Sequence, residues 1–110
     1  MQLFDEFNQK EVSWKGLEQF KTYAWQKQLH LFEVPFYYVE YAMAQLGAVA
    51  VWKKFKEDPK AGLQGYKNAL ALGYTKSISE IYEAAGIRFD FSTEYIRSLA
   101  DFVKAEMAKV

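Results

Sequence analysis

The chain has no cysteine, one histidine and two prolines in 110 residues. Without cysteine, neither a disulfide framework nor a thiolate metal site can form. With a single histidine, a zinc site would need carboxylates for its remaining ligands, which is uncommon. The sequence contains no His-Glu-x-x-His helix, no Gly-x-Ser-x-Gly turn, no P-loop and no dinucleotide-binding fingerprint. It therefore offers no metal site and no nucleophile of a recognised kind.

An excess of charge of either sign is also lacking, because fourteen basic residues balance fourteen acidic ones. This balance argues against a nucleic-acid binder and does little to oppose self-association. The N-terminus "MQLFDEFNQKEV" has early acids and no apolar core, so it is not a signal peptide. The longest apolar run, residues 42–52, is too short to span a bilayer. We expect a cytoplasmic protein with neither nucleic-acid nor membrane partners.

What the chain does have is apolar and aromatic residues, at 51% and 18% of the sequence. A chain of this length forms one domain, or a piece of a larger one, and can bury a core. The positions of helix-capping residues, prolines and glycines predict an all-α fold of about five helices with short connections. We treat residues 1–110 as a single segment.

The capping signals set the expected helix limits. Ser13 precedes an amphipathic helix over residues 14–32, and Pro35 opens an apolar, central helix that runs to about Lys56. Asp58 and Pro59 start a helix that ends at Gly73. "SISE" at residues 77–80 is a capping box for a short helix to Gly86, and Ser92 caps a last helix to about Lys109. We expect the inner face of that last helix to carry Ile96, Leu99, Ala100 and Val103. The stretch "MQLFDEFNQ" is interpreted as a short helix or a frayed end, and "GIRFDF" as an extended loop.

The stretch "QLHLFEVPFYYVEYAM" gathers the histidine, His30, with Tyr37, Tyr38 and Tyr41. On a helix, Tyr37 and Tyr41 would point the same way, and His30 lies across a proline-containing turn from both. One imidazole and two phenol groups can thus converge, and such donors suit a developing oxyanion. The alternative is structural, because tyrosine rings are commonly buried with one partner for the hydroxyl. His30 and Glu33, three residues apart, are too few to hold a metal.

Two blocks carry a resemblance to a known family. "WQKQLHLFEVPFYYVEYAMAQLGAVAVW" and the later "YKNALALGYTKSISEIYEAAGIRFDF" resemble the C-terminal part of oligoendopeptidase F-type zinc peptidases, relatives of thimet oligopeptidase. The resemblance implies a mostly helical catalytic domain with a deep channel. It assigns His30, Tyr37 and Tyr41 to catalysis by stabilising the oxyanion, and His30 and Tyr38 to substrate binding. In thimet oligopeptidase the segment between histidine and tyrosine is glycine-rich, whereas "LFEVP" has no glycine.

The same resemblance implies that the zinc-binding helix and its general base lie upstream of Met1. We therefore expect the C-terminal segment of a larger peptidase, with no cofactor of its own, zinc in the parent enzyme and an oligopeptide as substrate. We expect the isolated chain to be inactive and to self-associate. Whether this chain is itself an enzyme is a question that the sequence leaves open. The alternative is a free-standing helical protein-interaction module or a truncated gene product. The Arg88/Asp90 pair reads either as a structural ion pair or as a substrate contact.

Overall fold

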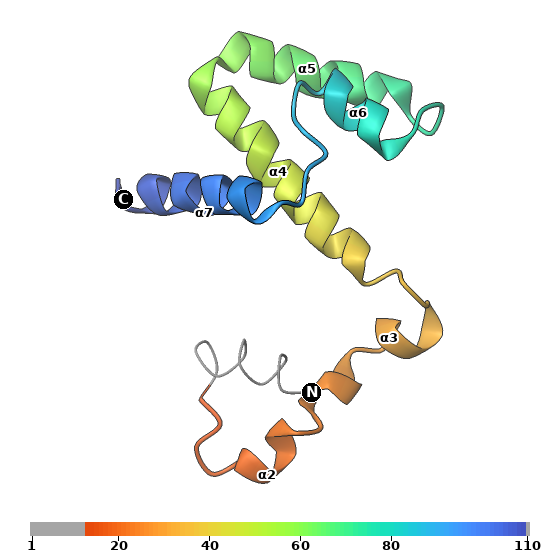
Figure 1. The fold of residues 1–110 in the computed structure, drawn as a ribbon, viewed down its shortest axis with the longest axis vertical. Helices are drawn as coiled ribbons and strands as arrows, with labels where there is room; N and C mark the ends of the chain where they lie inside the picture. Colours follow the sequence, from red (N-terminus) through yellow and green to blue (C-terminus); the bar gives the residue numbers. More distant parts are fainter. Residues whose placement is uncertain (1–12, 110) are drawn as a thin grey trace. The chain divides into compact units, whose positions relative to one another are not determined.

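The computed structural model describes residues 13–109 of the chain. In order, its elements are α2 (Glu18–Lys21), a 3₁₀ helix η1 (Ala24–Lys27), α3 (His30–Glu33), α4 (Val39–Glu57), α5 (Pro59–Leu72), α6 (Ile78–Ala84) and α7 (Thr93–Met107) (Figure 1). The described range contains helices and loops without a strand, so the all-α prediction is confirmed. The stretch "MQLFDEFNQ" lies outside the described residues.

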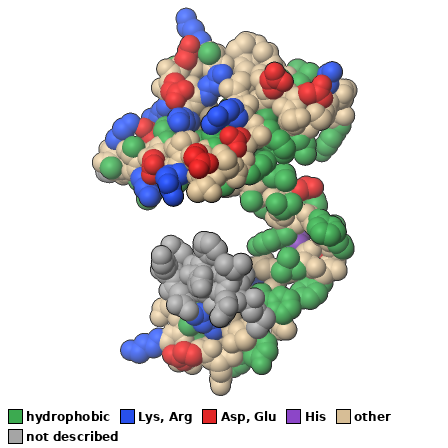
Figure 2. Space-filling view, in the orientation of Figure 1, with side chains coloured by type: hydrophobic (Ala, Val, Ile, Leu, Met, Phe, Trp, Pro, Cys, Tyr) green, Lys and Arg blue, Asp and Glu red, His purple; other side chains and the backbone are tan. Residues whose placement is uncertain are grey.

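The chain divides into two compact units, residues 1–39 and 40–110, and each is described by itself. The described part of the first unit contains α2, η1 and α3. The second unit contains α4 to α7 apart from the first residue of α4. On the surface of the second unit, acidic and basic side chains are interspersed (Figure 2), which agrees with the balanced composition.

The first unit corrects the prediction of one long helix over residues 14–32. Its three helices have four residues each, and the connections use i to i−3 bonds such as Tyr23 N–H to the Phe20 carbonyl, at 3.1 Å. Gly16 has φ 83°, and Gln28 interrupts the helical path with ψ 86°. Helices α2, η1 and α3 contain no buried residue. An amphipathic pattern becomes a long helix mainly by burying its apolar face, and here that stabilisation is missing.

The second unit begins with a sharp corner between two long helices. The Asp58 carboxylate accepts hydrogen bonds from the Lys60 and Ala61 N–H groups, both at 3.0 Å, and Pro59 is the first residue of α5. Across this corner Gly62 approaches the backbone of Phe55, where an added Cβ would lie 2.6 Å from the Phe55 Cα. The predicted cap is confirmed, and the missing side chain at Gly62 allows the two helices to meet closely.

Helices α5 and α6 lie side by side (Figure 1), and their junctions match the sequence signals. Gly73 ends α5 with φ 53°. The Ser77 hydroxyl accepts the Glu80 N–H, while a Glu80 carboxylate oxygen accepts the Ser77 N–H at 2.9 Å, which confirms the capping box. Residues 87–92 form a loop without regular secondary structure, in agreement with the loop predicted for "GIRFDF".

Helix α4 contacts the elements that follow it. The Tyr82 hydroxyl of α6 donates to the Met43 carbonyl at 2.8 Å, and the rings of Trp52 and Phe102 meet edge to face at 4.8 Å. Lys56 at the end of α4 forms an ion pair of 2.8 Å with Glu106 of α7. These contacts agree with the central position that its apolar sequence indicates.

The buried hydrophobic residues among those described are Ala50, Ala69, Ala85 and Leu99. The last of these is on α7, and its prediction as an inner residue is confirmed. Ile96 is 40% exposed and Ala100 is also exposed, so the predicted inner face is wrong at these two positions. The buried face is instead rotated toward Phe102, which packs on Trp52.

Candidate functional site

The first unit places the imidazole of His30 against two phenol rings. The ring centroids of His30 and Tyr37 are 6.2 Å apart with the planes 12° from parallel. Those of His30 and Tyr38 are 6.0 Å apart at 38°. Figure 2 shows the histidine, in purple, next to side chains of the hydrophobic class, which includes tyrosine. Three of the predicted site residues therefore form one ring cluster.

A tight turn brings these rings together. The Tyr37 N–H donates to the Val34 carbonyl at 3.1 Å, with Pro35 and Phe36 between them. Phe36 has φ 65°. Proline at the second position and a positive φ at the third are the features of a type II turn, in which the third position is normally glycine. The turn reverses the chain after α3, so that the tyrosines return toward His30.

This turn corrects the prediction that Tyr37 and Tyr41 share one helix. Helix α4 begins at Val39, four residues later than the proline at which we expected it to start. Tyr37 is therefore in the turn, whereas Tyr41 lies in the first turns of α4, in the second unit. The expected alignment of the two hydroxyls by helical spacing does not apply.

The tyrosines of this region are accessible from solvent. Tyr37 is 40% exposed, Tyr38 42% and Tyr41 51%. His30 is partly buried. A ligand can therefore reach the tyrosine rings.

A second aromatic pair in the first unit was not among the predicted site residues. The rings of Trp25 and Phe32 stack at 5.8 Å. Within the part of the chain that the structure describes, the indole N–H groups of Trp14 and Trp25 are buried without a hydrogen-bond acceptor. A buried donor without an acceptor is unfavourable, so these two groups are points of weakness in the unit. The sequence could have pointed to this pair only through the presence of tryptophan, and tryptophan by itself indicates only a large apolar ring.

The described residues do not fit a zinc ion. Across residues 13–109, histidine, aspartate and glutamate form no group of three that could hold a metal. His30 and Glu33 are the first and last residues of α3 and supply two potential ligands. A protein zinc site uses three or four, so we derive no step of a reaction through a metal held by these residues.

The Arg88/Asp90 pair forms a local network. The Arg88 guanidinium lies 3.8 Å from the Asp90 carboxylate and 4.5 Å from the centre of the Tyr95 ring. Asp90 also accepts the Ser92 N–H at 2.8 Å, and this hydrogen bond, with a smaller contribution from Arg88, lowers the pKa of the carboxyl group. The pair thus organises the loop before α7, while the Arg88 side chain stays 70% exposed.

A comparison with models of protein families identifies the family of this chain. The family model described as Peptidase family M3 matches residues 2–101. The chain belongs to this family. The match includes both sequence blocks that carry the resemblance and every residue of the ring cluster. Searches of curated proteins and of solved structures found no match.

Because the family match covers residues 2–101, nearly the whole chain is a segment of an M3 peptidase. Within the described residues, no helix is both long and apolar enough to cross a membrane.

Proposed function

We propose that this M3 chain is the C-terminal helical segment of a zinc-dependent oligopeptidase of the oligoendopeptidase F type. The observation that carries the proposal is the ring cluster of His30, Tyr37 and Tyr38, which lies inside the family match. Its role is to bind an oligopeptide and stabilise charge during hydrolysis of a peptide bond.

The chemistry assigned to these residues is hydrogen-bond donation. An imidazole N–H and phenol O–H groups can donate to a substrate carbonyl oxygen, and they do so more strongly as that oxygen becomes an anion. We assign oxyanion stabilisation to His30, Tyr37 and Tyr41, and backbone binding to His30 and Tyr38. The ring contacts of His30 with Tyr37 and Tyr38 restrict the rotamers of these three side chains, so less ordering is needed when substrate binds.

The metal and the general base belong, in this proposal, to a His-Glu-x-x-His helix outside this chain. The 110-residue chain alone should therefore not cleave peptides. Incubation with zinc and a quenched oligopeptide, with and without a chelator, tests this point. Chelator-sensitive cleavage by the purified chain would contradict it. The lack of cysteine favours a reducing, cytoplasmic location.

The assigned roles are tested in a polypeptide that joins the zinc-binding helix to this chain. We expect His30→Ala and Tyr41→Phe each to lower kcat by about 10²-fold or more, with a smaller rise in KM, because the donors act mainly in the transition state. Tyr74→Phe is the matched control, since Tyr74 is fully exposed on a loop of the second unit. Unchanged kcat in both site variants would refute the assignment.

A second candidate function is that of a helical interaction module, and an apolar groove in the second unit favours it. The groove has a volume of about 600 Å³ and is bounded by α4, α5 and α6. Small residues such as Gly47, Ala48 and Ala69 line it, and the exposed side chains of Leu70 and Tyr74 flank it.

The occupant we propose for this groove is a second copy of the chain. Leu70 is 62% exposed beside a groove of complementary apolar character, so two copies can exchange these side chains in a symmetric contact. A net charge of zero does not oppose their approach. Sedimentation should show a dimer that Leu70→Asp dissociates, with Leu63→Asp, 47% exposed on the same helix and outside the groove, as control. A monomer at high concentration would exclude this candidate.

A further inference from the structure

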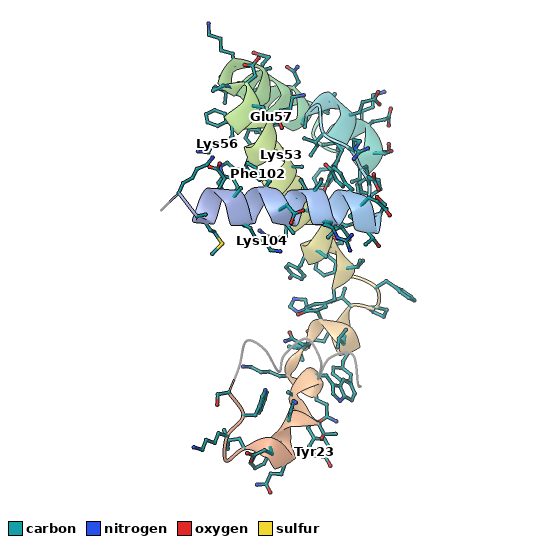
Figure 3. All side chains as sticks on the ribbon, turned by 60° about the vertical axis from the view of Figure 1, so that its left-hand side comes forward. Tyr23, Lys53, Lys56, Glu57, Phe102 and Lys104 are labelled. Atoms are coloured by element: carbon teal, nitrogen blue, oxygen red, sulfur yellow. The ribbon has the colours of Figure 1, made fainter. Side chains whose placement is uncertain are left out.

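A charged cleft in the second unit has no part in the function proposed above. It has a volume of about 480 Å³ and lies between the C-terminal half of α4, the start of α5, the loop before α7 and the first half of α7. Its charged lining consists of Lys53, Lys54, Glu57, Asp58 and Arg88. Lys53 and Glu57 are labelled on α4 in Figure 3.

Two buried apolar residues form part of the lining of the cleft. Ala50 is 5% exposed and Leu99 is 2% exposed, and both line the cleft. Charges beside such a lining are less screened by water than charges on an open surface, so they act more strongly on a bound ion.

Two lysines of this cleft lie outside the ion pairs of the described residues, although Glu57 and Asp58 line the same cleft. Lys53 and Lys54 are both partly buried, and among residues 13–109 neither forms an ion pair. The Lys54 ammonium donates to the Gly86 carbonyl at 2.9 Å, which fixes its position at the edge of the cleft and leaves its charge in place. A partly buried ammonium without a counter-ion favours the binding of an anion.

Arg88 adds a third cation on the loop side. Its guanidinium is oriented by the Tyr95 ring at 4.5 Å, and Asp90 is 3.8 Å away, at the limit of an ion pair. Its side chain is 70% exposed. A planar guanidinium in this position can bind a carboxylate with two hydrogen bonds.

The two acidic residues restrict which anion fits. Asp58 is occupied as the cap of α5, where it accepts two backbone N–H groups. Glu57 forms no ion pair within the described part of the chain. Its charge repels a doubly charged anion such as phosphate more strongly than a singly charged one. Lys53 and Lys54 form no ion pair, Arg88 is only loosely paired with Asp90, and Asp58 is engaged by the N-terminus of α5, so the modest positive charge that remains favours a monoanion.

We propose that this cleft binds a carboxylate group carried by a peptide. The carboxylate is either the C-terminal group or the side chain of an acidic residue, because both present the same two oxygens. That a peptide carries the group rests on the proposed function, whereas recognition of the carboxylate rests on the cleft alone. Binding can therefore be measured without any catalysis.

The test is a titration of the isotope-labelled chain, followed by amide NMR shifts. The probes are N-acetyl-Ala-Ala with a free carboxylate, the same peptide as its amide, N-acetyl-Ala-Glu amide, and inorganic phosphate. We expect saturable shifts around residues 53–58 and 86–88 with a carboxylate probe, and none with the neutral amide. Whichever carboxylate probe binds more tightly identifies the source of the group.

Three variants make the test specific. Lys53→Gln should weaken binding about fivefold, since it removes one charge-assisted hydrogen bond. Glu57→Gln should tighten binding about twofold, because it removes a repulsive charge. Lys67→Gln, at an exposed lysine of α5 outside the cleft, should leave the affinity unchanged.

Neither Lys53 nor Glu57 has an ion-pair partner in the described structure, so their variants should fold like the parent chain. Equal binding of amide and acid, tighter binding of phosphate, or equal weakening by Lys53→Gln and Lys67→Gln would each overturn the proposal. Absence of saturable shifts with both carboxylate probes would do the same. Turnover of the His30 variants plays no part in these outcomes, so the two proposals can fail separately.

Discussion

Replacing Gly62 by alanine measures how closely α4 and α5 approach at their corner. A Cβ on Gly62 would lie 2.6 Å from the Phe55 Cα, 2.8 Å from the Phe55 nitrogen and 3.2 Å from the Lys54 carbonyl carbon. These atoms are all backbone, so no side chain can rotate away to relieve the clash. Overpacking costs about 1–3 kcal/mol, and a rigid neighbour places this site at the upper end.

Alanine has an opposing benefit, because it favours a helix over glycine by about 1 kcal/mol. The net expectation is a loss of about 2 kcal/mol in the free energy of unfolding, which lowers Tm by roughly 8–12 °C for a chain of this size. Urea and thermal unfolding followed by circular dichroism at 222 nm measure both quantities. Lys67→Ala, on the exposed face of the same helix, should change stability by less than about 0.5 kcal/mol. Equal or greater stability of Gly62→Ala would show that the corner is more open than described.

Three further perturbations test local features. Phe36→Gly should stabilise the chain by about 1 kcal/mol, because Phe36 has φ 65° and is 95% exposed, so its ring contributes little burial to offset the strain. Ser77→Ala should cost about 1 kcal/mol by removing the capping box of α6. The ion pairs of Glu106 with Lys109 and Lys56 lower the pKa of that carboxyl group, so its stabilising effect is present above the ordinary glutamate pKa of 4.5 and is lost as pH falls through the lowered pKa. Glu106→Gln should therefore lower the urea midpoint at pH 7 and flatten its decline on acidification.

A specific result would contradict each of these three predictions. Lower stability of Phe36→Gly would mean that the phenylalanine ring makes stabilising contacts that exceed the strain. An unchanged urea midpoint for Ser77→Ala would mean that the cap contributes nothing net. Parallel pH profiles for Glu106→Gln and the parent chain would mean that the carboxyl group titrates alike in the folded and unfolded states.

The sequence predicted the second unit well because its signals are local. Asp58, Ser77 and Ser92 each satisfy backbone N–H groups within three residues, and this chemistry can be read without knowledge of the fold. Gly73 likewise marks the end of its helix by itself. The inner face of α7 was only partly predictable, since the rotation of a helix depends on what packs against it, here Trp52 against Phe102.

The first unit was predicted less well because periodicity alone does not make a helix. The pattern over residues 14–32 is amphipathic, yet none of its helices contains a buried residue, so breaks at residues such as Gln28 cost little. The turn at Phe36 could not be predicted from the sequence, because phenylalanine rarely adopts the left-handed backbone conformation found there.

For the candidate site, the sequence predicted that His30 would meet tyrosines across the Pro35 turn, and the rings of Tyr37 and Tyr38 lie against it. It misplaced Tyr37 on a helix. The charged cleft was not predicted, because it depends on segments that are distant in sequence, such as Lys54 and Gly86. Contacts of this range follow from the packing of α4 against the loop before α7.

The distribution of the three tryptophans has a practical consequence for spectroscopy. Trp14 and Trp25 belong to the first unit, whereas Trp52 belongs to the second and is in edge-to-face contact with Phe102 of α7. A chain with phenylalanine in place of the first two would retain one tryptophan, whose emission, excited selectively over that of tyrosine, reports the separation of α4 from α7. The converse substitution of Trp52 leaves tryptophan emission from the first unit alone. Two such chains, denatured in parallel, would show whether the units melt together or in sequence.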